Sequence, residues 1–177
     1  MVTLRDLKIA HVPSETGASF AENATIKAKD YAGKSGLLTL ADDSGLEVAA
    51  LGGAPGIHSA RYAGEGASDQ DRINLLLSNL RSVPTEKRTA RFVCVIALAH
   101  PDGNVHLFTG ECGGTIIFEA RGTNGFGYDP VFYMPELGKT MAELPEDVKN
   151  RVSHRARAAA QARAYLIQMA RGGVSQV

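Results

Sequence analysis

Three stretches of the chain repeat apolar residues at helical spacing, and each follows a residue that suits the start of a helix. The first begins at a capping box, Ser19 with Glu22, the second at Ser68 and the third at Ser153. Glycines are expected to close the first helix and the third. The apolar positions are Phe20, Ala24, Tyr31 and Ala32, then Ile73, Leu76, Leu77 and Leu80, then Ala162, Tyr165, Leu166 and Met169, and the closing glycines are Gly33, Gly36 and Gly172.

Other stretches show the short apolar runs or the alternation that predict strands. Residues 37–41 predict a short buried strand, and residues 91–99 alternate in a way that predicts a half-buried one. The turn sequence at 101–104 joins the latter to a strand at 105–109 as a hairpin, and residues 113–118 supply a further strand. Antiparallel strands mixed with helices predict an α/β fold with a mixed sheet.

Length and composition narrow the class of protein. The 177 residues fit a single α/β domain with a sizeable core. The 19 basic and 19 acidic residues cancel, so the charge gives no general case for binding nucleic acid or a membrane surface. Cys94 and Cys112 are too few for a disulfide framework and lack metal-site spacing, which indicates a reducing compartment. No apolar run reaches bilayer length, so we expect a soluble, cytoplasmic protein.

Two adjacent carboxylates, Asp42 and Asp43, follow the first apolar run and precede Ser44 and Gly45 in the sequence LADDSGL. The pattern predicts a loop at the end of a strand, where open α/β sheets usually bind ligands. Asp43 and Glu15 could share a Mg²⁺ ion, and one of them, or Asp42, could accept a proton from an attacking water. The alternative is structural, because Asp42 and Asp43 could cap a turn and Glu15 could lie on the surface.

The segment GTNGFGYDP, residues 122–130, combines three glycines with two aromatic rings. The glycines let the backbone approach a ligand closely, and Phe126 and Tyr128 offer ring faces on which a nucleobase can stack. Asp129 precedes a proline, which holds this end of the loop extended. The spacing matches neither a dinucleotide-binding fingerprint nor a Walker loop. A tight aromatic turn that only packs on the core remains the alternative.

Lys149 and the sequence Ser153-His154-Arg155 place fixed donors close together near the start of the last predicted helix. Such donors can pair with phosphate oxygens or with the exocyclic carbonyl of a base. Backbone N–H groups after the Ser153 cap would favour an anion further. A structural role is the alternative for His154 taken alone.

Together these segments resemble the inosine triphosphate pyrophosphatase family, the non-canonical purine NTP pyrophosphatases. The resemblance runs from about Ser14 to Gly172 and rests on five strings that occur in chain order. They are SFAENATIKA at residues 19–28, LADDSGLEV at 40–48, LGGAPGIHSARYAG at 51–64, GFGYDPVF at 125–132 and KNRVSHR at 149–155.

The resemblance implies a Mg²⁺-dependent enzyme that hydrolyses ITP, dITP, XTP or dXTP to the monophosphate and pyrophosphate, which cleanses the nucleotide pool. By the same resemblance Asp43 is the catalytic proton acceptor and a metal ligand, and Glu15 is a second metal ligand. The implied substrate contacts are Ser44, Phe126, Gly127, Tyr128, Asp129, Lys149, His154 and Arg155. The implied fold is an elongated, two-lobed α/β domain with a central mixed β-sheet flanked by helices, an active-site cleft between the lobes, and a homodimer.

One departure from the family pattern raises rival functions. Family members begin with an apolar strand and a Thr/Ser-x-Asn-x-x-Lys loop that binds triphosphate, and we expect residues 1–177 to form a single pyrophosphatase domain without either. The first rival is a non-catalytic nucleotide-binding or dimerisation module. The second is a metal phosphohydrolase that cleaves a phosphomonoester with Asp42 and Asp43.

Overall fold

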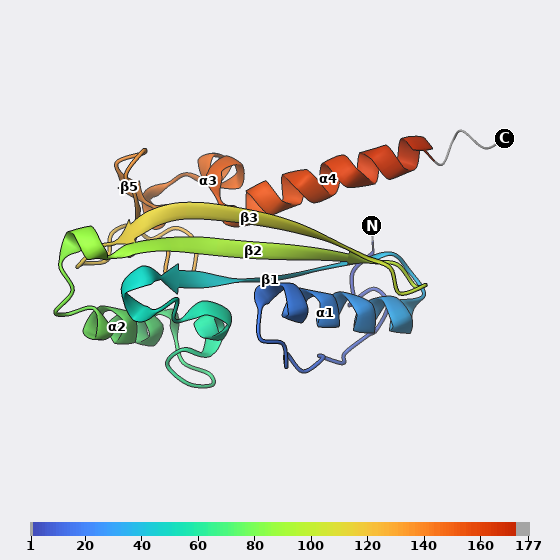
Figure 1. The fold of residues 1–177 in the computed structure, drawn as a ribbon, viewed down its shortest axis with the longest axis horizontal. Helices are drawn as coiled ribbons and strands as arrows, with labels where there is room; N and C mark the ends of the chain where they lie inside the picture. The colour runs from blue at the N-terminus through green and yellow to red at the C-terminus, as the bar shows by residue number, and fades with distance from the viewer. Residues whose placement is uncertain (1, 173–177) are drawn as a thin grey trace.

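A sheet with the strand order β1-β2-β3-β4-β5 forms the middle layer of the molecule in the computed structural model, which describes residues 2–172 (Figure 1). The helices are α1 (Phe20–Ser35), α2 (Asp69–Asn79), α3 (Glu146–Val152) and α4 (His154–Gly172). The strands are β1 (Thr39–Val48), β2 (Thr89–Ala99), β3 (Val105–Ile116), β4 (Phe132–Met134) and β5 (Lys139–Thr140). Short 3₁₀ turns are η1 (Ala49–Leu51), η2 (Gly56–Arg61), η3 (Thr85–Lys87) and η4 (Met141–Glu143).

The α/β class is confirmed, but the expected mixed sheet is not. Every strand pair within residues 2–172 is antiparallel. The hairpin after β2 is confirmed, since the His100 N–H donates to the Asn104 carbonyl at 2.8 Å. The two strands expected at 105–109 and 113–118 are one strand, β3, because the glycines between them continue the pairing with β2 instead of breaking it.

Helices α1 and α4 cover opposite faces of the sheet, and in Figure 1 they lie below and above it. Small side chains let both helices approach closely: Ala24, Ala28 and Ala32 of α1 against Val93 and Val95, and Ala158 and Ala162 of α4 against Cys94 and Ile96. Strand β2 is therefore buried on both faces. The prediction that the strand at 91–99 is only half-buried was wrong, because α4, a helix far along the chain, covers the second face of this strand.

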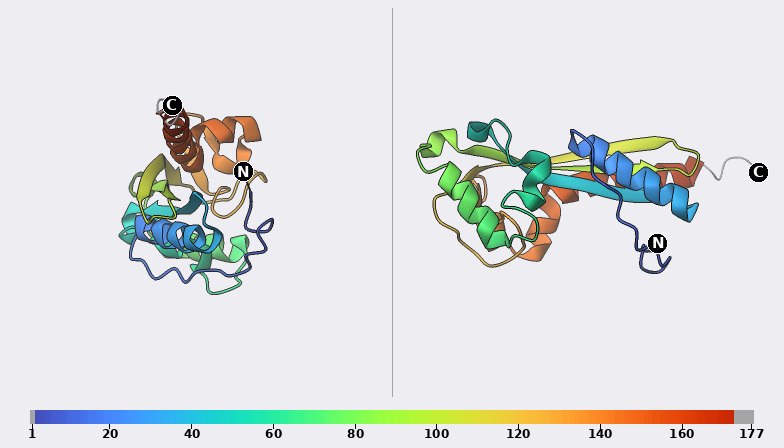
Figure 2. Two further views of the ribbon diagram at one scale, coloured as in Figure 1. Left: turned by 90° about the vertical axis from the view of Figure 1, so that its right-hand side faces the viewer. Right: turned by 90° about the horizontal axis from the view of Figure 1, so that it is seen from below.

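The end of the elongated molecule that carries α2 and α3 holds a separate apolar cluster (Figure 2). Ile73, Leu76 and Leu80 of α2 pack there against Phe132 of β4 and Met141 of η4. The middle of the sheet, where α1 and α4 both begin, lies between the two packed ends (Figure 1). None of the helices within residues 2–172 is long and apolar enough to cross a lipid bilayer.

The predicted helix starts are confirmed. The Ser19 hydroxyl accepts from the Glu22 N–H, although the Glu22 carboxylate reaches the N–H of Ala18 and not that of the cap itself. Ser68 forms a full capping box with Asp71, and the Ser153 hydroxyl accepts from the N–H of Ala156 in α4. Helix α3 was not predicted, since its seven residues are too few to show a period.

The prediction of a loop at the end of a strand for Asp42–Gly45 was wrong. These residues lie in the middle of β1, where Asp43 pairs with Val95 and Ser44 pairs with Cys94 of β2. Strand β1 tolerates the charges because it is an edge strand whose side chains remain partly exposed. The buried run expected at 37–41 is also corrected, because Leu37, Leu38 and Leu40 are exposed.

The position of α4 depends on Gly110 of β3. A Cβ atom at this position would lie well inside van der Waals contact with the His154 carbonyl and the Ala158 nitrogen. We expect Gly110→Ala to displace α4 and to lower the free energy of unfolding by about 1–3 kcal/mol, as overpacking does. Urea unfolding followed by circular dichroism measures this change.

Gly113→Ala is the matched control. Gly113 lies on the same strand, and its added Cβ would meet no atom within 4 Å. Its free energy of unfolding should stay within about 0.5 kcal/mol of the wild-type value. If Gly110→Ala and Gly113→Ala lowered the free energy of unfolding equally, close packing against α4 would not be the reason for a glycine at position 110.

Candidate active site

Strand β1 places its two neighbouring carboxylates on opposite faces of the sheet, because side chains alternate along a strand. Asp43 lies on the face covered by α1, where it meets Lys27 and Asn23. Asp42 lies on the face covered by α4, where it meets Arg155. The two carboxylates therefore cannot act as a pair, and each belongs to a different half of the site.

On the α1 face, Lys27 joins the two acidic residues that the sequence selected. Its Nζ lies 2.8 Å from Asp43 Oδ1 and 2.9 Å from Glu15 Oε1. Arg61 of η2 adds a second cation, 3.7 Å from Glu15 Oε2. Asn23, fully buried one helical turn before Lys27, accepts from the Gly17 N–H at 2.8 Å and donates to Asp43 Oδ2 at 3.4 Å. The structure thus brings Glu15 and Asp43 together, as expected.

Burial and the neighbouring charges shift the pKa values of Asp43 and Lys27. Burial raises the pKa of the Asp43 carboxyl, and Glu15 adds to the shift, while Lys27 and Asn23 oppose it. Burial alone would lower the pKa of Lys27, but the hydrogen bonds and charges of the two carboxylates leave it above its ordinary value. A partly desolvated carboxylate with a raised pKa is suited to accept a proton.

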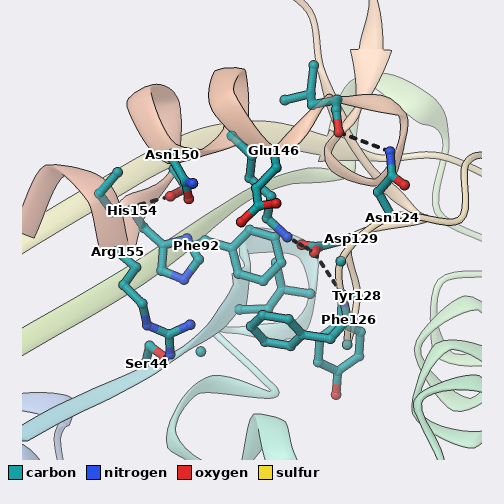
Figure 3. A pocket seen from close by; sticks show the side chains of 18 of the residues that line it. Ser44, Phe92, Asn124, Phe126, Tyr128, Asp129, Glu146, Asn150, His154 and Arg155 are labelled. Carbon is teal, nitrogen blue, oxygen red and sulfur yellow. Dashed lines mark hydrogen bonds and ion pairs between the residues drawn. The ribbon is translucent and has the colours of Figure 1, made fainter.

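On the other face, a cleft of about 1300 Å³ opens between β1, the glycine-aromatic loop at 122–130, α3 and the start of α4. All eight of the expected substrate contacts line it: Ser44, Phe126, Gly127, Tyr128, Asp129, Lys149, His154 and Arg155. Figure 3 shows Ser44, Phe126 and Arg155 among the side chains around this cleft. The sequence thus selected a set of residues that the fold brings together from four separate segments.

The glycine-aromatic loop presents one ring to the cleft and buries the other. Phe126 is 62% exposed, and Lys149 Nζ and Arg155 Cζ lie 5.1 and 5.8 Å from the centroid of its ring. Tyr128 is buried, and its hydroxyl donates to the Ser59 carbonyl at 2.9 Å. Of the two ring faces expected from the sequence, Phe126 is therefore the open one, and Tyr128 anchors the loop.

Charged contacts hold this loop from two sides. The Gly127 N–H donates to Asp69 of α2 at 2.6 Å, and this bond lowers the pKa of the Asp69 carboxyl. Asp129 is buried, and its Oδ2 accepts from the Phe126 N–H at 3.1 Å and from the ammonium of Lys149. With its carboxylate engaged in this way, Asp129 stabilises the loop and fixes Lys149 beside the Phe126 ring.

His154, the first residue of α4, stacks on Phe92 of β2 with ring centroids 4.8 Å apart. Its Nδ1 is buried without a hydrogen-bond partner among the described residues. An unpaired buried nitrogen costs about 1–3 kcal/mol, so packing on Phe92 leaves part of the hydrogen-bonding capacity of this ring unmet. Burial lowers the pKa of His154 to about 4, and the charges of Arg155 and Lys149 act in the same direction, so the ring is neutral at pH 7.

Four residues of the site were not selected from the sequence: Lys27, Asn23, Arg61 and Asp69. Asn23 and Lys27 are four residues apart on α1, so they share the face that also carries the buried alanines. A polar residue on the apolar side of a predicted helix was the available signal. Asp69 had none, because the first turn of a helix is an ordinary place for an aspartate.

The fold and the site define an α/β protein that carries an acidic cluster on one face of an edge strand and a cleft with an exposed aromatic ring on the other. The model of the Ham1 family matches residues 1–165, and the chain belongs to that family. Relatives include the dITP/XTP pyrophosphatase of Geobacter sulfurreducens, 52% identical over 166 residues, which are 94% of this chain and 83% of that protein. The dITP/XTP pyrophosphatase of Thermus thermophilus is 51% identical over 158 residues, 89% of this chain and 75% of that one.

Solved structures agree with this assignment. The Staphylococcus aureus Ham1 protein superposes with a TM-score of 0.89 and 45% identity, over 95% of this chain and 86% of that one. The nucleoside-triphosphatase, or dITP/XTP pyrophosphatase, of Mycobacterium abscessus gives 0.78 and 44%, over 90% and 84% of the two chains. The membership expected from the sequence motifs is confirmed.

The low pKa of His154 predicts how stability depends on pH. The unfolded chain protonates this residue near pH 6.5 and the folded chain only near pH 4, so its effect is absent above pH 6.5 and destabilises the fold as the pH falls towards 4. We expect this residue to account for a loss of up to about 3 kcal/mol. In His154→Gln, the free energy of unfolding plotted from pH 7 to pH 4 should fall less steeply than in the wild type. Parallel curves would contradict the lowered pKa.

Proposed function

We propose that this protein hydrolyses non-canonical purine nucleoside triphosphates such as dITP, XTP and ITP to the monophosphate and pyrophosphate. The observation that carries the proposal is the partly buried Asp43 carboxylate, which Lys27 and Asn23 hold on one face of β1 while a cleft with an open aromatic ring lies on the other. The names of the relatives at 51–52% identity support the same reaction.

The cleft suits a purine with an oxo group. The base stacks on Phe126, and Lys149 and Arg155 beside that ring donate to exocyclic carbonyl oxygens. Adenine presents an amino donor where inosine and xanthine present an oxygen, and the nearby Asp129 carboxylate is already engaged by Lys149 and the Phe126 N–H. A canonical adenine would therefore leave donors unpaired, which discriminates strongly against it.

The cleft and the acidic cluster lie on opposite faces of β1, an edge strand of the sheet, so a nucleotide bound in the cleft would pass its phosphate chain across this strand towards Asp43. Ser44, Gly45 and Leu46, which follow Asp43 in β1, line the cleft. Both α1 and α4 begin near the middle of the sheet in Figure 1, so their N-termini add partial positive charge there. Lys27 and Arg61 are the side-chain cations available to the phosphate chain on the α1 face.

The donor set fits Mg²⁺. Oxygens of Glu15 and Asp43 already converge on one cation, the Lys27 ammonium, so the pair is placed to share a positive charge. Mg²⁺ usually takes one or two carboxylates and completes its coordination with water and substrate phosphates, and the described residues offer no larger group of ligands. When bound, the ion would supply neutralisation of the phosphate charge.

In the proposed reaction, Asp43 accepts the proton of the water that attacks the α-phosphorus, and pyrophosphate leaves. Its raised pKa makes it a better base than an exposed aspartate. Lys27 keeps the carboxylate oriented and stabilises charge that develops on the phosphates. A phosphomonoesterase that uses Asp42 and Asp43 together is disfavoured, because the two side chains lie on opposite faces of β1.

The homodimer and the cytoplasmic location that the sequence analysis expected remain part of this proposal. Sedimentation of the purified chain tests the first, and fractionation of cells tests the second.

Product analysis tests the proposed reaction directly. The purified chain is incubated with dITP, ITP, XTP and ATP, with and without Mg²⁺, and the products are resolved by ion exchange. We expect monophosphate and pyrophosphate from the first three, little turnover of ATP, and no turnover without the metal. Release of orthophosphate would indicate a different phosphohydrolase, and tight ITP binding without turnover would indicate a binding module.

Asp43→Asn tests the proton acceptor. The amide keeps the shape of the side chain but not its basicity, so we expect kcat for dITP to fall at least about a thousandfold. Lys27 keeps Glu15 as a partner, so the fold should persist, which circular dichroism verifies. Glu47→Gln is the control, since Glu47 is another carboxylate of β1 that pairs with an arginine, Arg91, outside the cleft. A near-normal rate in Asp43→Asn would remove Asp43 from this role.

A further inference from the structure

We propose that Asp42 is a positioning residue for base recognition: it orients Arg155 over the cleft and takes no part in the chemistry at Asp43. The inference rests on the proposed function and concerns how the same site selects its purine.

Within the described residues, the hydrogen bonds of the Arg155 side chain all go to β1. Its Nε and Nη2 lie 3.1 and 3.0 Å from Asp42 Oδ2, and Nη2 also donates to the Ser44 hydroxyl at 3.0 Å. Figure 3 shows Arg155 extended from α4 towards Ser44 at the side of the cleft. Asp42 and Arg155 are 113 residues apart in the sequence, so only the fold creates this contact.

The two partners differ in how firmly the fold holds them. Asp42 lies in β1, whose backbone pairs with β2 at Ile96, and its Oδ2 is 3.7 Å from the thiol of the buried Cys94. Arg155 has a long side chain that is 45% exposed, and within the described residues Asp42 is its one carboxylate partner. A long exposed side chain loses considerable rotamer freedom when it is ordered. Asp42 is therefore the fixed member of the pair, and it sets where the guanidinium lies.

That position matters because Arg155 also lies beside the ligand platform. Its Cζ lies over the Phe126 ring, 5.8 Å from the ring centroid, so a base stacked on Phe126 would come within reach of the guanidinium. A guanidinium held by a carboxylate on one side keeps N–H groups free for an oxygen on the other. Asp42 would thus present Arg155 to an oxo purine without touching the substrate itself.

The expected signature of this role is a change in substrate affinity alone. Asp42→Asn is isosteric and leaves Arg155 solvated, so the fold should persist. We expect the KM for ITP to rise about fivefold with kcat within about twofold of wild type, the size expected when a partly exposed ion pair is lost. Inhibition by inorganic pyrophosphate, which has no base, should keep its wild-type constant.

Two further variants separate positioning from a general structural effect. In an Arg155→Ala background, Asp42→Asn should change the KM for ITP no further, because its only route of action has been removed. Asp42→Glu should recover part of the lost affinity, since it restores the charge. Glu47→Gln again serves as the control for loss of an ion pair from β1.

The possible outcomes discriminate clearly. A fall in kcat at unchanged KM would place Asp42 in the chemistry and overturn the inference. So would unchanged kinetics, additive effects with Arg155→Ala, or a weaker inhibition by pyrophosphate. If the wild-type chain itself does not hydrolyse dITP or ITP, the proposed function fails, whereas an active wild type with a silent Asp42→Asn refutes only the role of Asp42.

Discussion

The alternation of side chains along β1 is the constraint on which the site depends. A strand has only two faces, so consecutive residues must point apart, and the sequence Asp42-Asp43-Ser44 is divided between two chemical environments. One receives an acidic cluster built with α1, and the other receives an arginine from α4. Because both carboxylates are fixed to the same rigid strand, the separation between the two halves is set by the backbone and not by flexible side chains.

The covering helices make this arrangement possible. Alanines on α1 and α4 let both pack closely on β2, and Gly110 allows the backbone of α4 to touch β3 directly. Close contact fixes where each helix begins, and the residues at or near those starts are the ones the site uses. His154 and Arg155 lie in the first turn of α4, while Asn23 and Lys27 lie in the first half of α1.

The parts of this structure that could be predicted from the sequence are those that local chemistry determines. Ser19, Ser68 and Ser153 cap helices because a hydroxyl and nearby N–H groups suffice, and the hairpin after β2 needs only its turn residues. The glycine-aromatic loop and the Lys149 and His154 segments were found because their residue types fit poorly with mere packing, and the family resemblance assigned their roles. The cleft that gathers them was confirmed.

What escaped prediction depends on distant partners. The charges at 42 and 43 were interpreted as the end of a strand, but β1 continues because an arginine and a lysine from other segments meet them. Burial of the second face of β2 likewise depends on α4. Lys27 had no feature in the sequence that set it apart from other helix lysines, because its partners Glu15 and Asp43 are distant in the chain.

The ammonium of Lys27 also means that the acidic cluster carries its own counter-ion. A divalent ion arriving alone would have to compete with the charge of Lys27. An ion that arrives with a polyphosphate brings new anions with which the displaced lysine can pair. The cluster therefore favours binding of metal and nucleotide together.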